Sequence, residues 1–271
     1  MIKTIECVPL HYWDLRVNFG DLLAPWLVER MTGRPVTFIK ENRSCVHYVV
    51  VGSILGHVRS TSIVWGVGSF GTEQKERVEK RAKYLAVRGP LTRNKILTAG
   101  GHCPDIYGDP GLLVPLFYQP EIEKKHDVGV IIRHSEQKWR KSLSKTNIKV
   151  IDLNTDAIED TVKDICSCKR IVSSSLHGLI LADAYGIPNA WLESESPWGG
   201  TFKYWDYLIS VDKVKHPVRF DMGAADLTSA DIVSAVSFDG RKIKLDLNAL
   251  IDANPFGWNP SADIRSIISL R

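Results

Sequence analysis

The fold is decided by residues 170–188, RIVSSSLHGLILADAYGIP, which read as a buried strand, a polar turn and a helix in immediate succession. Strand-forming residues end at Val172, and apolar residues then recur at helical spacing until Gly186 and Pro188 end the helix. The polar residues 173–177 therefore lie where strand becomes helix. At such a place unpaired N–H groups and the positive end of the helix dipole face outward, so a phosphate or carboxylate finds donors there.

The same turn also has a purely structural interpretation. Serines are good helix caps, and His177, in the first helical turn, could be a satisfied surface or core residue. This short motif alone does not decide between an anion site and a capped helix, so the rest of the chain has to be considered.

The length and composition of the chain limit the class of protein. A chain of 271 residues suits two domains, with one large α/β domain as the alternative. Hydrophobic residues make up 44% and charged residues 24%, as in an ordinary globular protein. No run approaches the ~20 apolar residues of a membrane helix, and the N-terminus lacks a signal-peptide pattern. We therefore expect a cytoplasmic protein.

Charge and cysteine content argue against nucleic acid and metal ions as ligands. The net charge of +4 comes from scattered lysines and arginines, which fits an anionic substrate or peripheral contact with acidic lipids better than nucleic acid. Five cysteines without framework spacing favour reduced thiols. Cys166 and Cys168 have no further ligands at zinc spacing nearby, so we expect no metal.

The first half of the chain alternates strands and helices. Asp21 is a candidate N-cap for a helix that Gly33 and Pro35 close, although residues 18–21 could equally be a ligand loop. The glycines of residues 66–71 superficially match a dinucleotide-binding turn, but no acidic residue follows at the end of the next strand. That strand places Arg88 at its carboxyl end, where open α/β sheets bind ligands. We expect strands at residues 3–10, 36–39, 46–51, 63–66 and 84–87, and a charged helix at 72–83.

A proline-bearing, charged segment at residues 115–127 marks a domain boundary. We predict an N-terminal domain at residues 1–120 and a C-terminal domain at 121–271, with the last helices as candidates for a return to the N-terminal domain. The second half restarts the alternation with strands at 128–132, 149–153, 170–172 and 189–192 and helices at 135–144, 156–166, 229–236 and 246–253.

Four motifs, taken in this order, resemble the polysaccharide pyruvyl transferase family: NFGD at 18–21, RGPLT at 88–92, GDPGLL at 108–113 and SSLHG at 174–178. Similarity to that family implies an α/β protein of two Rossmann-like domains facing across a cleft, as in GT-B glycosyltransferases. It implies pyruvate transfer from phosphoenolpyruvate to a sugar as a ketal, on a polyprenyl-diphosphate-linked oligosaccharide at the cytoplasmic face of the inner membrane. Phosphoenolpyruvate would be a co-substrate, and no cofactor or metal is implied.

The resemblance assigns roles to particular residues. His177 and Arg88 would be catalytic. Many members have Arg before Leu-His-Gly where this chain has Ser175, so a cationic contact to the donor would come from elsewhere, such as Arg133. The donor site would comprise Arg88, Arg133, Ser173, Ser174, Ser175, Leu176, His177 and Lys203. The acceptor site would comprise Asn18, Gly20, Asp21 and Trp198, the last from an aromatic run that could stack on a sugar ring.

Two other functions remain open at this level. A GT-B-like glycosyltransferase would hold the diphosphate of a nucleotide sugar at the same helix start. A non-catalytic carbohydrate-binding subunit is the third hypothesis, because the aromatic run is suited to sugars and Ser175 replaces a common arginine.

Overall fold

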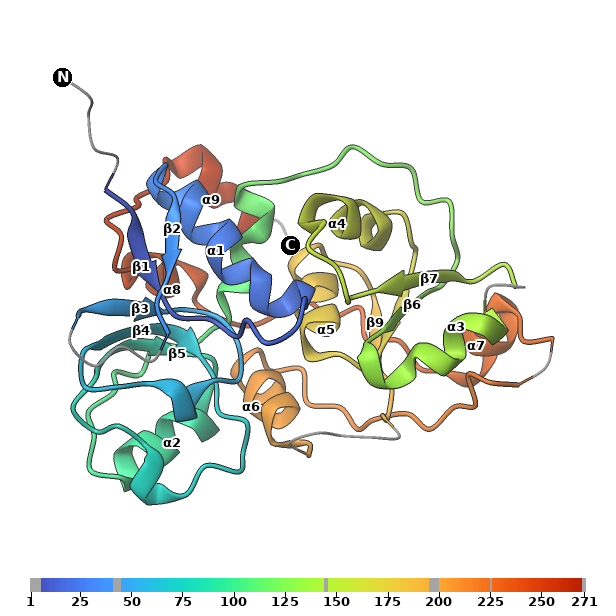
Figure 1. Ribbon diagram of the computed structural model, residues 1–271. Coiled ribbons are helices and arrows are strands. Elements are labelled where there is room, and N and C mark those ends of the chain that lie inside the picture. Colours follow the sequence, from blue (N-terminus) through green and yellow to red (C-terminus); the bar gives the residue numbers. More distant parts are fainter. Residues whose placement is uncertain (1–5, 41–44, 144–145, 195–199, 225, 270–271) are drawn as a thin grey trace.

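The computed structural model describes residues 6–40, 45–143, 146–194, 200–224 and 226–269. It is an α/β fold with two parallel sheets and surrounding helices (Figure 1). The strands on the two sides of residues 117–128 belong to different sheets.

The first sheet has the strand order β2-β1-β3-β4-β5, and every pairing in it is parallel. Its central strands are buried on both faces, as the continuous apolar runs predict. The elements of this half are β1 Val8–Leu10, α1 Phe19–Thr32, β2 Val36–Phe38, β3 His47–Val49, η1 Leu55–His57, β4 Ser62–Val67, η2 Lys75–Arg77, β5 Lys83–Val87, α2 Pro90–Thr98 and η3 Pro110–Leu116.

The second sheet has the order β7-β6-β8-β9, again entirely parallel. The strand, turn and helix predicted from residues 170–188 are confirmed as β8 and α5, with His177 in the first helical turn. The elements of this half are β6 Gly129–Ile132, η4 His134–Glu136, α3 Gln137–Leu143, β7 Lys149–Asp152, α4 Ile158–Cys166, β8 Ile171–Ser173, α5 Leu176–Ala184, β9 Asn189–Trp191, α6 Phe202–Ser210, α7 Ser229–Ala235, α8 Leu247–Asp252 and α9 Ala262–Ser269.

The last two helices lie beside the first sheet, next to β1 and α1 (Figure 1). The indole Nε1 of Trp65 in β4 donates a hydrogen bond of 2.9 Å to the carbonyl of Leu250 in α8. Leu250 is fully buried in the same core as Trp65. The C-terminal segment therefore crosses back from the second sheet and adds to the core of the first.

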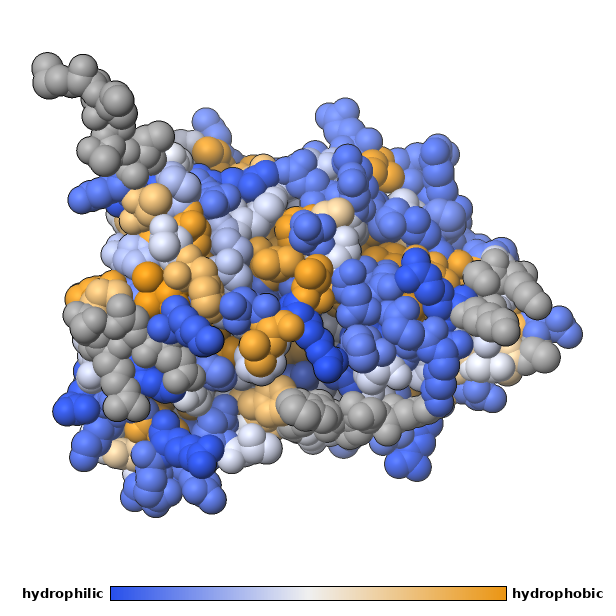
Figure 2. Space-filling view, viewed as in Figure 1, coloured by the Kyte–Doolittle hydropathy of each residue, from blue (hydrophilic) through white to orange (hydrophobic). Residues whose placement is uncertain are grey.

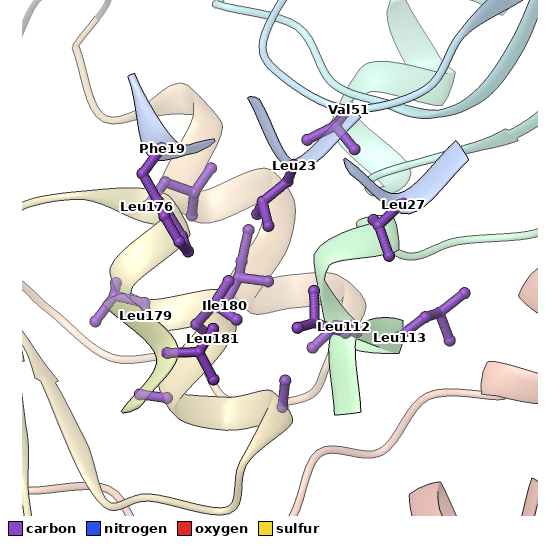
Figure 3. Packing of buried hydrophobic residues seen from close by; sticks show 14 of the residues in the cluster. Phe19, Leu23, Leu27, Val51, Leu112, Leu113, Leu176, Leu179, Ile180 and Leu181 are labelled. Carbon is purple, nitrogen blue, oxygen red and sulfur yellow. The ribbon is translucent and has the colours of Figure 1, made fainter. Parts of the chain in front are cut away.

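The two sheets are joined by a shared apolar core. Figure 3 shows Phe19 and Leu23 of α1, Leu112 of η3, and Leu176 and Ile180 of α5 packed together, and all five are at most 4% exposed. Since α1 and η3 come from the first half and α5 from the second, this core fixes the start of α5 against the first half. The residues predicted to form the site lie at the same junction.

One predicted helix start and one predicted helix are wrong. Helix α1 begins at Phe19 with Asn18 as N-cap, because the Asn18 side chain accepts from the Gly20 N–H at 3.0 Å, and Asp21 lies inside the first turn. The charged helix predicted at residues 72–83 is absent, with only the short turn η2 in its place. There the Glu73 carboxylate accepts from the backbone N–H groups of Phe70 and Gly71 and so holds a loop.

The surface of the molecule is mixed. Figure 2 shows hydrophobic residues gathered in the middle of the face on view, with hydrophilic residues dominating the part that carries the second sheet. Leu15 and Val17, in the loop before α1, are 72% and 57% exposed. Within the described ranges, no helix is both long enough and apolar enough to cross a bilayer.

Candidate functional site

The turn between β8 and α5 is held by its own serines. The Ser173 hydroxyl accepts from the Ser175 N–H at 3.0 Å and donates to the Ser175 carbonyl at 2.9 Å. Ser175 is the N-cap residue, yet its side chain makes no capping hydrogen bond. The buried Ser174 hydroxyl has no partner among the described residues, while the Ser174 carbonyl accepts from Tyr204 at 2.5 Å. The interpretation of these serines as simple helix caps is therefore wrong.

The imidazole of His177 is packed between the two halves of the molecule. Its ring lies against Gly20 of α1, where an added Cβ would be 1.9 Å from Nδ1, so only glycine fits. Its Nε2 lies 3.7 Å from Oδ2 of Asp109, which is too long for a hydrogen bond. Burial, followed by the positive charges of Arg88 and Lys203, lowers the pKa of His177 to about 3. The imidazole is thus neutral at physiological pH and able to accept a proton.

Arg88 lies at the carboxyl end of β5, as predicted, but is fully buried. Its Nε donates to Asp206 at 3.2 Å, its Nη1 to the Ser53 hydroxyl at 2.9 Å and its Nη2 to the Ser69 carbonyl at 3.0 Å. Every guanidinium nitrogen is thus engaged by the protein. Arg88 acts on the site through its charge and by fixing α6, since Asp206 belongs to that helix.

Lys203 lies in the first turn of α6 and is the least engaged cation of the described site. Its Nζ lies 5.3 Å from the ring of Phe70 and 5.4 Å from that of Tyr204. Burial, together with the charges of Arg133 and Arg88, lowers its pKa to about 7. A bound anion would favour the charged form of this lysine.

Arg133 follows β6 and faces the same region, held by other side chains. Its Nε donates to both carboxylate oxygens of the buried Glu136 at 3.2 Å, and its Nη2 donates to the Ser194 hydroxyl. Glu136 also accepts from the Arg133 N–H, so the arginine is fixed from two directions. The guanidinium is therefore kept at a set position at the end of the second sheet.

The predicted acceptor residues lie at the start of α1. Asn18 donates to Asp21 at 2.8 Å, and burial raises the pKa of Asp21 to about 7 although the charge of Lys203 opposes this. The Phe19 N–H donates to the Leu153 carbonyl at 2.9 Å, which ties this helix start to the second sheet. Trp198, also predicted for the acceptor, lies outside the described residues.

The structure brings most of the predicted site together. His177, Arg88, Lys203, Arg133 and Asp21 are electrostatically coupled to one another or to shared neighbours. The Leu176 side chain is an exception, because it is only 4% exposed and packs in the core beside Phe19 (Figure 3). Leu176 can offer only backbone groups to a ligand.

Sequence reasoning missed three buried carboxylates, namely Glu136, described above, and Asp206 and Asp109. Asp206 accepts from the Thr92 N–H at 2.8 Å and hydroxyl at 2.6 Å as well as from Arg88. Asp109 is fully buried, and burial raises its pKa to about 6 against the opposing charge of Arg88. The GDPGLL motif contained Asp109 without indicating a role, and nothing in the aromatic run singled out Asp206.

The described residues thus form a site with a neutral histidine at a helix start, three cations and four carboxylates at the junction of two parallel sheets. Such a site suits an anionic ligand that undergoes proton transfer. The sequence model of the family described as polysaccharide pyruvyl transferase matches residues 18–196. The chain belongs to that family, which confirms the resemblance of its motifs.

Two relatives extend this result. The chain is 29% identical over 213 residues to a protein of Acanthamoeba polyphaga mimivirus called uncharacterized protein L143, covering 73% of this chain and 72% of that one. It is 27% identical over 221 residues to the succinoglycan biosynthesis protein ExoV of Rhizobium meliloti (strain 1021), covering 77% of this chain and 66% of that one. No solved structure matches the chain significantly.

Proposed function

We propose that this protein transfers pyruvate from phosphoenolpyruvate to two hydroxyls of a sugar in an exopolysaccharide repeat unit, forming a ketal. Family membership and the similarity to a succinoglycan biosynthesis protein support polysaccharide pyruvylation. The donor, an acceptor linked to polyprenyl diphosphate at the inner membrane, and a GT-B-like arrangement of two domains are parts of the proposal.

The reaction sets clear demands on the site. Two acceptor oxygens bond to C2 of phosphoenolpyruvate and the C2–O bond to phosphate breaks. Of the two protons that the hydroxyls lose, one ends on C3, which becomes a methyl group, and the other leaves with phosphate. A base is needed at the hydroxyls, and cations are needed at the carboxylate and the phosphate.

The neutral His177 at the start of α5 is the observation that carries the proposal. Its low pKa leaves it unprotonated, and the negative charge of a bound donor beside it would raise that pKa toward the range in which a histidine acts as a base. Lys203 and Arg133 would contact the anionic donor, and the start of α5 would add backbone N–H donors. In this scheme Arg133 and Lys203 supply the cationic contact that Ser175 cannot.

Two other functions compete with this one. A glycosyltransferase using a nucleotide sugar would exploit the same cations and helix start. A non-catalytic carbohydrate-binding subunit would use the acceptor region alone. A nucleotide also requires a slot and polar partners for its base, and the described site residues are dominated by charged groups suited to a small anion.

The decisive experiment is a phosphate-release assay with phosphoenolpyruvate and a lipid-linked oligosaccharide, with mass spectrometry of the product. We expect phosphate release and a product heavier by one pyruvate less one water. Calorimetric titration with phosphoenolpyruvate and with nucleotide sugars is the companion measurement. Binding of a nucleotide sugar, with no heat from phosphoenolpyruvate even with acceptor present, would replace the proposal by the glycosyltransferase. No turnover with any donor would favour the binding subunit.

A further inference from the structure

Two buried polar atoms face each other across the junction of the two halves. Nε2 of His177 and Oδ2 of Asp109 lie 3.7 Å apart, and both lack a hydrogen-bond partner among the described residues. Buried polar atoms in native proteins are nearly always paired, so each such exception calls for a physical explanation. Here the two exceptions are complementary, since one ring nitrogen can donate and a carboxylate oxygen can accept.

Asp109 is built to present that one oxygen. Its Oδ1 accepts from the Gly111 N–H at 2.9 Å and so caps η3. The side chain is fully buried, which leaves Oδ2 directed at the imidazole with no alternative partner among the described residues. The fixed backbone of Pro110 follows directly, which limits movement of this turn.

The two ring nitrogens of His177 differ in access. Nδ1 packs beside Gly20 and makes no hydrogen bond to a described residue. Unlike Nε2, however, it is not fully buried. Nδ1 is therefore the nitrogen that solvent or substrate can reach. A neutral imidazole carries one proton, and a hydrogen bond at one nitrogen leaves the other as the base.

We propose that Asp109 is the positioning residue of this site: its Oδ2 accepts the Nε2 proton of His177, which keeps Nδ1 unprotonated for the acceptor hydroxyl. This inference rests on the proposed function and specifies how its base is prepared. Hydrogen bonds of this kind are often long in ligand-free enzymes and tighten with substrate. Because Asp109 caps η3 in the first half and His177 lies in α5 of the second, a shift of about 1 Å between the halves would close the contact.

The charges around Asp109 are compatible with this role. Arg88 favours its ionised form, while Asp206, Asp21 and the buried phenol of Tyr207 lie near enough to be coupled to it. With a pKa raised to about 6, Asp109 is mainly ionised above neutrality and loses its charge in mild acid. Activity should then fall as the pH drops through about 6.

Asp109→Asn is the sharpest test, because Asn keeps an oxygen for the Gly111 N–H and changes only the group that faces His177. The amide would donate to Nε2 and move the imidazole proton to Nδ1. We expect kcat to fall about 10²- to 10⁴-fold with the KM for phosphoenolpyruvate changed less than about threefold. The matched control is Asp246→Asn, an exposed cap of α8 that accepts from the Ala249 N–H at 3.0 Å.

A pH profile separates positioning from mere structural support. The phosphate of the donor titrates near pH 6 in every variant, so the wild type and Asp109→Asn must be compared directly. In the wild type we expect kcat to fall on the acid side of the profile as Asp109 is protonated. In Asp109→Asn this contribution to the fall should be absent. An unchanged fall in acid, or a kcat within about threefold of the wild type, would overturn the inference.

A second readout needs no turnover, and its wild-type result does not depend on the folding of Asp109→Asn. Nitrogen-15 NMR of histidine-labelled protein, with the His177 signal assigned by its loss in His177→Asn, reports which ring nitrogen carries the proton. We expect the proton on Nε2 at pH 8 and on Nδ1 in Asp109→Asn. A wild-type proton on Nδ1 would overturn the inference. If the proton sits on Nε2 while phosphoenolpyruvate is not a substrate, the positioning survives and the proposed donor fails.

Discussion

Two buried polar clusters in this molecule use similar groups but differ in how completely those groups are paired. In the lysine cluster, Asp183 accepts from Lys213 at 2.6 Å, Asn189 at 2.7 Å and Tyr207 at 2.7 Å. In the histidine cluster, formed by Asp109, Ser174 and His177, one polar atom of each residue has no described partner.

The difference shows what each cluster does. A fully paired buried network ties elements together, and the lysine cluster joins α5, α6 and β9 in this way. Unpaired buried groups cost free energy, so the histidine cluster lowers the free energy of unfolding of the protein. That cost is expected where a ligand or a reaction completes the hydrogen bonding.

Breaking the lysine cluster should have the largest effect, and on stability alone. Lys213→Met leaves the Asp183 carboxylate buried without its counter-ion, so we expect a loss of about 3–5 kcal/mol in the free energy of unfolding. Urea unfolding measures it, and turnover per folded molecule should be unchanged. Lys244→Met is the matched control, because the Lys244–Asp212 pair is largely exposed and solvent screening leaves it little weight. Equal losses in both variants would show that the buried pair has no special weight.

Breaking the histidine cluster should affect turnover instead. We expect His177→Asn to lower kcat by about 10²-fold or more, because a positioned base is lost. At pH 7 and without ligand, its free energy of unfolding should change by less than about 1 kcal/mol, since Nε2 at 3.7 Å from Asp109 makes no full hydrogen bond in that state. Near-normal turnover with an unchanged melting temperature would make His177 a structural residue.

The sequence predicted local structure well where all the residues that determine it lie within one short segment. The β8 strand, its turn and α5 were readable because a strand run, a polar turn and a helical period follow one another within residues 170–188. Asp21 was mistaken for the N-cap because Asn18 and Asp21 are equally good capping types. Only the backbone geometry of Asn18, which is extended, distinguishes them.

The rest of the site depends on contacts between distant segments, which local patterns do not encode. Asp206 lies 118 positions from Arg88 in the sequence, and they meet only because α6 packs beside α2. Asp109 faces His177 because the shared core sets η3 against α5. The sequence places Glu73 in a charged helix. In the structure its carboxylate instead accepts hydrogen bonds from backbone N–H groups of the preceding loop.

The pH dependence of stability gives a smaller effect that separates the clusters. The pKa of His177 is lowered to about 3 in the folded protein from an ordinary 6.5, so the unfolded chain binds the extra proton between these values. His177 therefore destabilises the fold as the pH falls below 6.5, by up to about 1.4 kcal/mol for each pH unit.

This sign predicts how His177→Asn should respond to acid. Between pH 7 and pH 5 the variant should gain about 1–2 kcal/mol relative to the wild type in urea unfolding. Subtracting the two curves removes the titrations that both proteins share. Parallel stability curves would mean that His177 is as easily protonated in the folded protein as in the unfolded chain.

The smallest effect compares two helix caps, one inside the site and one outside it. Asn18→Ala removes the acceptor of the Gly20 N–H, and Thr228→Ala removes that of the Asp231 N–H at the start of α7. Each should lower the free energy of unfolding by about 1 kcal/mol. Only Asn18→Ala also frees Asp21, whose carboxylate accepts from Asn18 and is coupled to Lys203.

Turnover then tells the two caps apart. Loss of the hydrogen bond from Asn18 to Asp21, worth about 1 kcal/mol, should lower kcat/KM about fivefold in Asn18→Ala, while Thr228→Ala keeps the wild-type value. Initial rates of phosphate release, measured well below both melting temperatures, make the comparison. Equal rates in the two variants would leave the start of α1 as a cap with no part in the site. A fivefold loss confined to Asn18→Ala would extend the site to this helix, because the two variants lose the same kind of hydrogen bond.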